Sequence, residues 1–569
     1  MGDIDENLDS ARSSNDPVLT EKVRRLIRPE ALKKHEPLVW SPGIGADVWE
    51  MFCAAITGDL DTIERLLKKD PSLVRSTYEY RGALSFAVRE NQLEAAKLLL
   101  ERGANPINGG AGDTLLQMAR DRGYVAMEKL LEAALAGVSG TTSKGMAIAA
   151  AIRERNLTKV RGLLDGSPDL VHARDERTNQ PIHWAVMTRQ LDIIDELLGR
   201  GADVNSQRFD GARPIQLTNG DYNYRGWRDV AEDTAATPRD VLTHLRARGA
   251  YCDICTAAYI GDLERVRELL DQDASLANRP SDYVSYYACS GTPLRNAAAG
   301  GHVEIVRLLL ERRADPNLPE EGIAPRGHAL HSAVCNGHTE IVQLLLQHGA
   351  FANVEIESSA DTLSAAIAQS NQPMIDLLCS YGAARNVHLL AYYGDVQTAA
   401  AVFAANPMLA DDPEALENAA GQGHEPFVRL MLRYQPDLAK RVAVGVEGRG
   451  PRDPVKTREM AELLFQHGMN PSLPNWLRIT PLHRFAQRGD LENAAIFIDH
   501  GADLDARDEE YRSTPLGYAA RLGKTAMVEL LLSRGAKPNL PDDLPWATPL
   551  AWATRRGHHE IVALLSQHN

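Results

Sequence analysis

Three segments of this chain share one pattern of 27 residues without gaps, and this repetition limits the possible folds more than any other feature. The segments are GTPLRNAAAGGHVEIVRLLLERRADPN from Gly291, ITPLHRFAQRGDLENAAIFIDHGADLD from Ile479 and STPLGYAARLGKTAMVELLLSRGAKPN from Ser513. One such unit cannot bury its own apolar face, so it is stable only when it is stacked on neighbours. The 569 residues also exceed the roughly 250–300 at which a single core stops growing. We therefore expect one long array of stacked units.

Each part of the pattern has a structural task. Thr292 stands where a hydroxyl can cap a helix, and Pro293 takes the first helical position. Gly301 ends this first helix, because glycine adopts the left-handed backbone of a helix end at the lowest cost. A second, amphipathic helix follows, with apolar side chains from Ile305 to Leu310. The order of these features closely resembles the consensus of the ankyrin repeat.

The residue that ends the first helix gives a register for the whole chain. Most spacings between these residues are 32–36, close to the ankyrin unit of about 33 residues. The spacings after 189 and after 423 each fit two units, one of them degraded. The resemblance implies an all-α repeat solenoid, an ankyrin-repeat superhelix of about sixteen helix-turn-helix units with short β-hairpin fingers. The clear register positions are 58, 91, 123, 155, 189, 261, 301, 337, 370, 394, 423, 489, 523 and 557.

The array is expected to cover residues 49–569, preceded by two short segments. Residues 1–16 are polar and acidic, and we expect a disordered tail. Residues 17–48 carry a short amphipathic helix around Val23, Leu26 and Ile27, which is expected to cap the first unit. Some units end in a different turn, such as KKDPSLV from Lys68, and we interpret them as openings of sub-blocks. The sub-blocks would cover about 49–136, 146–250, 251–384, 385–475 and 476–569.

Two aromatic-rich departures from the pattern lie on adjacent units. About 15 residues are inserted in the degraded unit between 206 and 250, and the finger that follows is also long. Tyrosine, tryptophan and arginine are enriched at binding hot spots. One hypothesis is that these side chains contact a partner, and the other is that they cover the faces that a broken helix exposes. The candidate partner-binding residues are Tyr222, Tyr224, Arg225, Trp227, Arg228, Tyr283, Tyr286 and Tyr287.

Signals for catalysis or metal binding are weak. Cys252 and Cys255 have a zinc-like spacing, but a structural zinc site needs four ligands and no second pair exists. Most of the histidines recur at fixed positions of the unit. His183, His331, His388 and His483 stand where the histidine of ankyrin repeats ties adjacent loops together. No phosphate-binding loop, nucleophile elbow or HExxH helix occurs. We therefore predict no catalytic residue, no cofactor, no metal and no enzyme activity.

Charge and composition favour a protein partner. The net charge of −15 argues against broad nucleic-acid binding. A local basic island of Arg449, Arg452, Lys456 and Arg458 stands against this trend. No stretch approaches the roughly 18 apolar residues of a membrane helix. The acidic start is unlike a secretory signal, and six cysteines suit a reducing compartment, so we expect a cytoplasmic monomer.

The resemblance implies a concave surface made of first helices and fingers, which binds other proteins. The expected function is a non-catalytic scaffold that mediates protein–protein interaction through this surface and the inserted loops. The alternative is a small-ligand receptor or enzyme with a site built by the 206–240 insert and the 277–291 finger, which would require an enclosed polar pocket. The concave positions expected to be exposed include Arg89, Glu90, Asp121, Arg122, Glu154, Arg521 and Leu522.

Overall fold

The chain folds into stacked units, each made of two antiparallel helices. The computed structural model describes residues 23, 25–107, 113–139, 143–175, 177–208, 210–221, 224, 226, 230–283, 289–357, 361–443 and 454–568. Within these residues fourteen units carry both helices and two are incomplete, so the expected all-α repeat solenoid of about sixteen units is confirmed. The first helices are α4 (Gly45–Thr57), α6 (Ala83–Arg89), α8 (Leu115–Arg122), α10 (Ser143–Arg153), α12 (Pro181–Met187), α16 (Ile254–Ile260), α18 (Pro293–Gly300), α20 (His328–Cys335), α22 (Thr362–Ala368), α24 (Val387–Tyr393), α26 (Pro413–Gly421), α29 (Pro481–Arg488), α31 (Pro515–Arg521) and α33 (Pro549–Arg556). The second helices are α5 (Leu60–Lys69), α7 (Leu93–Glu101), α9 (Val125–Ser139), α11 (Leu157–Gly166), α13 (Leu191–Gly199), α17 (Leu263–Gln272), α19 (Val303–Glu311), α21 (Thr339–Gln347), α23 (Gln372–Ser380), α25 (Val396–Ala405), α27 (Glu425–Tyr434), α30 (Leu491–Asp499), α32 (Thr525–Ser533) and α34 (His559–Gln567).

Local chemistry sets the ends of the helices as the sequence predicts. Thr292 caps α18 by accepting a hydrogen bond from the backbone N–H of Arg295 at 3.1 Å. All fourteen register positions have a positive φ, including those that are not glycine. Asn91 and Ser370, for example, have φ of 57° and 54°. The left-handed residue is therefore a property of the unit, which glycine meets at the lowest cost.

The alternative unit endings form short 3-10 turns. These are η1 (Pro71–Arg75), η2 (Pro168–His172), η4 (Ala274–Asn278) and η5 (Pro407–Ala410). Asp70 shows why the turn forms, because its side chain accepts a hydrogen bond from the N–H of Ser72 at 2.9 Å. Asp273 makes the same bond to Ser275 at 2.9 Å. In these two units an aspartate that caps the next turn thus replaces the usual glycine ending, and Asn406 caps η5 in the same way. The boundaries of the sub-blocks stay a prediction.

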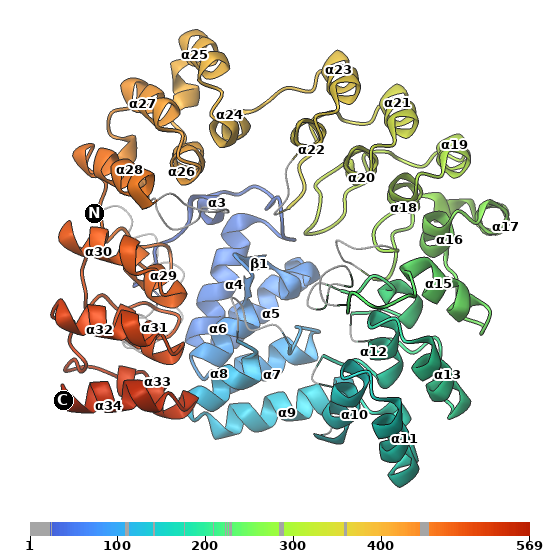
Figure 1. Cartoon of the computed structure of the whole chain (residues 1–569), viewed down its shortest axis with the longest axis horizontal. Helices are drawn as coiled ribbons and strands as arrows, with labels where there is room; N and C mark the ends of the chain where they lie inside the picture. The colour runs from blue at the N-terminus through green and yellow to red at the C-terminus, as the bar shows by residue number, and fades with distance from the viewer. Residues whose placement is uncertain are drawn as a thin grey trace.

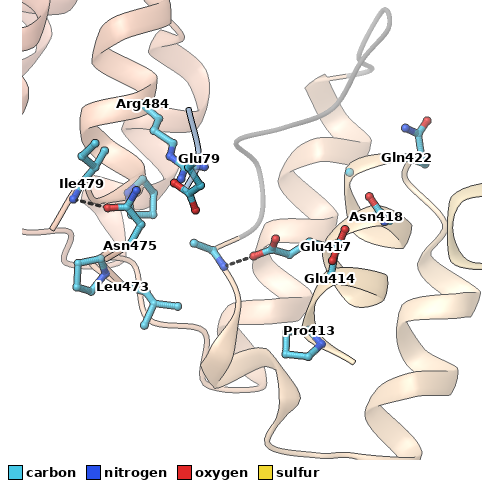
Figure 2. Close-up of a pocket in the computed structure, with 14 residues that line it drawn as sticks. Glu79, Pro413, Glu414, Glu417, Asn418, Gln422, Leu473, Asn475, Ile479 and Arg484 are labelled. Carbon is cyan, nitrogen blue, oxygen red and sulfur yellow. Dashed lines mark hydrogen bonds between the residues drawn. The ribbon is translucent and has the colours of Figure 1, made fainter. Parts of the chain in front are cut away.

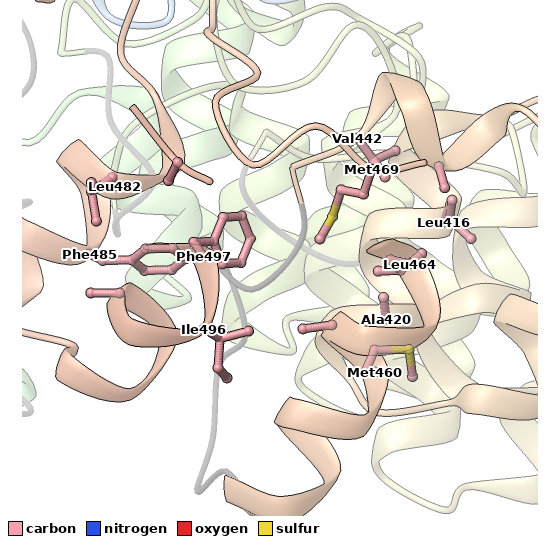
Figure 3. Close-up of a cluster of buried hydrophobic side chains, with 14 of the residues drawn as sticks. Leu416, Ala420, Val442, Met460, Leu464, Met469, Leu482, Phe485, Ile496 and Phe497 are labelled. Atoms are coloured by element: carbon pink, nitrogen blue, oxygen red, sulfur yellow. The ribbon is translucent and has the colours of Figure 1, made fainter. Parts of the chain in front are cut away.

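Both incomplete units keep their second helix. In the first, η3 (Pro214–Leu217) stands in place of the first helix, and α15 (Pro238–Arg246) follows. In the second, α28 (Pro454–Gln466) packs against α30 through Phe465 and Phe497, whose ring centroids are 5.1 Å apart. Figure 3 shows the apolar cluster that continues across this unit, with Leu464 on one side and Phe485 beside Phe497 on the other. The array therefore continues through its incomplete units.

Fingers connect the units, and the first of them is a β-hairpin. Strands β1 (Thr77–Tyr78) and β2 (Arg81–Gly82) pair antiparallel, with Tyr78 opposite Arg81. The two residues of the turn, Glu79 and Tyr80, have φ of 46° and 65°. Tyr78 of this hairpin packs against the apolar core of the first units. The capping segment before the array forms α3 (Glu30–Lys33), and the expected tail of residues 1–16 lies outside the described residues.

The array curls into a closed ring. Figure 1 shows α18, α20 and α22 on the inside of the ring and α19, α21 and α23 on the outside. The chain returns to its start, so that α29, α31 and α33 lie beside α4, α6 and α8. The apolar core of residues 23–131 accordingly includes Trp476 and Leu477 from the C-terminal part. Three further apolar clusters cover residues 148–245 together with Tyr283, 254–383 and 387–565.

Candidate functional site

Two of the candidate aromatic residues lie in the part of the chain that the structure describes. Tyr283 is 2% exposed and belongs to the apolar cluster around α12. The ring of Tyr224 meets Trp184 edge to face, with centroids 5.3 Å apart. The guanidinium of Arg153 lies over both rings, 5.0 Å from the centroid of Trp184 and 5.9 Å from that of Tyr224. Both tyrosines therefore pack against the protein itself.

A buried arginine fastens the insert to the unit before it. Arg208 donates hydrogen bonds to Asn179 at 3.0 Å and to Asp221 at 2.5 Å, and it also pairs with Asp210. Burial alone would lower the pKa of Arg208, but the carboxylates of Asp210 and Asp221 outweigh this effect and raise its pKa. Asp221 also accepts the backbone N–H of Tyr224 at 2.7 Å. The start of the insert is thus held by a charged network.

The other candidate residues fall where the structure gives no description. For this reason their contact with a partner stays a prediction. Tyr224 and Tyr283 fit the second hypothesis, in which aromatic rings cover the faces of the incomplete unit. The residues outside the described part are Tyr222, Arg225, Trp227, Arg228, Tyr286 and Tyr287.

The concave positions of the two ends of the array are covered, and the expectation that they are exposed is wrong for most of them. Arg89, Asp121 and Arg122 are 6%, 3% and 6% exposed. The side chain of Arg521 is 10% exposed and that of Glu90 is 8% exposed. The cause is the closure of the ring, which places these positions of the first units against those of the last. Glu154 and Leu522 are exposed as expected.

We call the surface where residues 23–131 meet residues 475–556 the seam. Its centre is the finger of residues 508–511, which reaches α6 and α8. The carboxylate of Glu510 accepts a hydrogen bond from Nε of Arg81 at 2.8 Å, and its carbonyl oxygen accepts one from Arg122 at 2.6 Å. The side chains of Arg81 and Glu510 are only 8% and 6% exposed. This ion pair is therefore inside the protein.

Further ion pairs surround this centre. Arg556 pairs with Asp121 at 2.6 Å, and Arg521 pairs with Asp113. Asp113 also accepts a hydrogen bond from the hydroxyl of Tyr511 at 3.1 Å. Because each pair joins an N-terminal unit to a C-terminal unit, the seam is electrostatically complementary along its length.

An apolar anchor completes the seam. Trp476 is 5% exposed and packs edge to face on Tyr78 and Phe86, at centroid distances of 5.5 and 5.9 Å. Its indole N–H donates to the carboxylate of Glu79 at 2.8 Å. Its carbonyl oxygen accepts the N–H of Ile27 at 3.1 Å. The finger that carries Trp476 is thus built into the N-terminal core.

An acidic cavity of about 510 Å³ borders the seam. Figure 2 shows Glu414 and Glu417 of α26 on one side, with Glu79 and Arg484 on the other. Glu417 accepts a hydrogen bond from the N–H of Ala443 at 3.2 Å. A second cavity lies beside α13 and is lined by Asp195 and Arg248, among others. Neither of these two cavities is lined by the 206–240 insert or the 277–291 finger.

Comparison with protein families identifies the repeated unit. A model described as "Ankyrin repeats (3 copies)" matches residues 323–388 and 455–542. A second, "Ankyrin repeats (many copies)", matches 294–346, and a single "Ankyrin repeat" matches 179–208. These units are ankyrin repeats. The resemblance seen in the sequence is therefore confirmed.

Curated proteins match parts of the chain. A putative E3 ubiquitin-protein ligase, XBAT31 of Arabidopsis thaliana, is 27% identical over 27% of this chain and 37% of its own length. The serine/threonine-protein kinase VIK of the same plant is 43% identical over 10% of this chain and 12% of its own length. Human ankyrin repeat domain-containing protein 49 is 41% identical over 10% of this chain and 23% of its own length. The chain thus spans less than two fifths of each of these relatives.

Histidines connect neighbouring ankyrin units in two ways. His183 and His483 bond the finger that follows, at 3.1 Å to the carbonyl oxygens of Ser206 and Ser513, as the sequence predicts. His388 likewise contacts the loop that follows, through Asp412 at 3.1 Å, and the ring of His331 lies 3.6 Å from the sulfur of Cys335. The second connection was not foreseen. The histidine after the register glycine contacts the carbonyl oxygen at the end of the preceding first helix, with His302 to Tyr259 at 2.9 Å, His424 to Tyr392 at 2.9 Å and His558 to Arg521 at 3.2 Å. The recurrence of Gly-His in the sequence was the signal for it.

Two further features concern metals and membranes. The described part of the ankyrin array contains no group of three or more His, Cys, Asp or Glu side chains that could hold a metal ion. Cys255 is buried, with its sulfur 3.4 Å from the carbonyl oxygen of Gly291, and the sulfur of Cys252 lies 3.8 Å from the carbonyl oxygen of Asp253. Among the described helices, none is long and apolar enough to cross a membrane.

Proposed function

We propose that this chain is a non-catalytic ankyrin-repeat scaffold that binds another protein through its concave surface and inserted loops. Repeat arrays of this kind use extended concave surfaces for recognition. Ring closure covers the concave positions at both ends, so the partner surface is the part that stays open. That part lies on α20, α22, α24 and α26.

The observation that carries this proposal is the exposure of Tyr392. In register it stands where Arg89 stands in the second unit, but it is 45% exposed whereas Arg89 is 6% exposed. Its ring rests edge to face on Tyr393 at 5.1 Å, and its carbonyl oxygen is fixed by His424. An exposed tyrosine held by its neighbours offers a large contact area at a small cost in conformational entropy.

The surroundings of Tyr392 support a partner with basic groups. The next first helix, α26, carries Glu414 and Glu417, which line the acidic cavity. At the ends of the two preceding first helices, the polar side chains of Asn336 and Gln369 are exposed one position before the register residue, next to the register position of Tyr392. A tyrosine flanked by amides and carboxylates fits a protein surface with lysine or arginine at its rim.

The test is affinity capture with two matched variants. Tyr392→Ala removes the exposed ring from the concave surface, and Tyr381→Ala removes a ring of similar exposure (44%) from the end of α23. We expect a partner captured by the wild type to be lost with Tyr392→Ala and kept with Tyr381→Ala. Retention by both variants, or loss with both at unchanged thermal stability, contradicts the proposal for this surface.

The inserted loops are tested by a separate variant. This variant combines Tyr222→Ala, Trp227→Ala and Tyr286→Ala. Its partner capture and its melting temperature are compared with those of the wild type. Loss of the partner at an unchanged melting temperature supports contact through the loops. A lower melting temperature supports a structural role for these aromatic residues.

We also propose a reducing, cytoplasmic location. All six cysteines lie in the described residues and none forms a disulfide. Cys53 is fully buried, and burial raises the pKa of its thiol to about 12, which keeps it unreactive. Thiol titration of the denatured protein should find all six as free thiols, and fewer would contradict this location.

A further inference from the structure

We propose that the cluster of Arg81, Arg89 and Arg122 is a recognition site for an acidic peptide segment that carries an aromatic residue, and that the 508–511 finger of the same chain is its resident occupant. A partner with the same chemistry would displace the finger and open the ring. This inference rests on the proposed scaffold function, because it names a second partner surface and its ligand class.

The arginine cluster is built to receive an acidic group. Arg81 comes from β2 and directs its guanidinium to the carboxylate of Glu510. Arg122 is held by the carbonyl oxygen of Met118 at 3.2 Å and lies 4.7 Å from the ring centroid of Trp546. Burial lowers the pKa of Arg122, so its positive charge is costly without a nearby anion.

The cluster has more donors than the finger uses. Nη1 of Arg89 and Nε of Arg122 are buried and have no hydrogen-bond acceptor among the described residues. Buried donors without acceptors are rare, since each costs desolvation energy that no bond returns. A ligand with more acceptors than the resident finger could therefore satisfy these donors as well.

The finger shows which ligand the cluster accepts. Asp508 shapes its turn by accepting the N–H groups of Glu510 at 2.6 Å and Tyr511 at 2.7 Å. The turn presents the carboxylate and the carbonyl oxygen of Glu510 to two arginines at once. Tyr511 then inserts between the guanidinium of Arg521, 4.2 Å from its ring centroid, and Asp113. The recognised unit is an acidic turn followed by a tyrosine.

A displaceable finger is consistent with the chemistry of the seam. The contacts of the finger are mostly ion pairs and hydrogen bonds, and an external ligand with the same groups can replace each of them. In the free protein the finger occupies the arginine cluster because it belongs to the same chain, which gives it a high effective concentration at the cluster. A partner must therefore bind more groups of the cluster than the finger does.

The experiment uses the chain's own segment as a probe. A fluorescein-labelled peptide of residues 505–515 is titrated with the full-length wild type and with the Glu510→Ala variant, and binding is read by fluorescence anisotropy. The variant should bind the peptide at least about tenfold more tightly than the wild type, because its own finger no longer fills the anion site. A matched peptide with Glu509→Gln and Glu510→Gln should lose that gain.

Two further variants locate the site and guard against misfolding. Adding Arg81→Ala to Glu510→Ala should abolish the tighter binding. If circular dichroism shows that Glu510→Ala is unfolded, Arg556→Ala takes its place. Its pair with Asp121 is at the partly exposed rim of the seam, outside the finger and the arginine cluster. Arg556→Ala weakens the seam, so the finger leaves the cluster more readily and the variant should also bind the peptide more tightly than the wild type.

The inference is overturned if the wild type and Glu510→Ala (or Arg556→Ala in its place) bind the peptide with equal affinity. It is also overturned if adding Arg81→Ala leaves the affinity of Glu510→Ala for the peptide unchanged. The outcome is independent of the test of the scaffold. Peptide binding with no effect of Tyr392→Ala on partner capture contradicts only the proposed partner surface. A partner lost with Tyr392→Ala together with no peptide binding contradicts only this inference.

Discussion

Arg81 and Glu510 form a buried ion pair although 429 positions separate them in the sequence. The pair joins the second unit of the array to the finger between α30 and α31, which connects the third-last unit to the second-last. Ankyrin arrays are usually described as contacts between neighbours alone. Here the ends also contact each other, so the stability of the first units depends on the last ones.

The first prediction concerns this pair. Arg81→Ala should destabilise the protein by about 3–5 kcal/mol, because it leaves the carboxylate of Glu510 buried without its partner. Arg75→Ala is the matched control, since its pair with Glu321 is at the surface, with side chains 56% and 52% exposed. It should change stability by no more than about 1 kcal/mol. Urea midpoints measure both, and equal effects would contradict a buried seam.

The second prediction concerns Trp476. Trp476→Ala removes the apolar anchor of the seam and should cost about 3–5 kcal/mol. Hydrogen exchange should become faster in α6 and in α29 together, because the tryptophan joins these two ends. Exchange in α20 and α21, on the far part of the ring, should stay as in the wild type. Faster exchange confined to α29 would show that the ends are not coupled.

The third prediction concerns acid pH. Burial lowers the pKa of His183 to about 3 and that of His483 to about 4, from 6.5. The neutral rings therefore contribute their full stability above pH 6.5, and this contribution falls as the pH drops below 6.5 towards the folded-state pKa. At pH 5 the loss is roughly 2 kcal/mol for each histidine.

His483→Gln tests this linkage. The variant should be less stable than the wild type at pH 7.5, because it loses the bonds to the next finger. Between pH 7.5 and pH 5 it should lose about 2 kcal/mol less than the wild type does. Urea midpoints at the two pH values give both quantities. An identical loss in both proteins would mean that His483 is protonated in the folded state.

The fourth prediction compares two glycines with a left-handed backbone. Gly301 has a φ of 74°, and a Cβ atom there would lie 2.7 Å from the ring of His338. Gly349 has a φ of 83° and open space around it. Gly349→Ala should cost about 1 kcal/mol for the backbone alone. Gly301→Ala should cost clearly more, because it also displaces His338 from its place on the next unit. Melting temperatures of the two variants decide this.

The repeats could be read from the sequence because the forces that form them act within one unit. Threonine capping, proline at the first turn and a left-handed residue at the helix end involve residues a few positions apart. All fourteen register positions accordingly have the predicted backbone. The contact of the finger histidines His183 and His483 also follows from the pattern, because it joins adjacent units.

Ring closure was decided only by the tertiary structure. It depends on small rotations between units that add up along the whole array, and no local pattern encodes their sum. Arg89, Asp121 and Arg122 have the charge of exposed concave residues, yet closure buries them against the last units. The sequence by itself thus determined the units and their order. Packing between distant units decided which concave positions are covered, and so which part of the surface stays open to a partner.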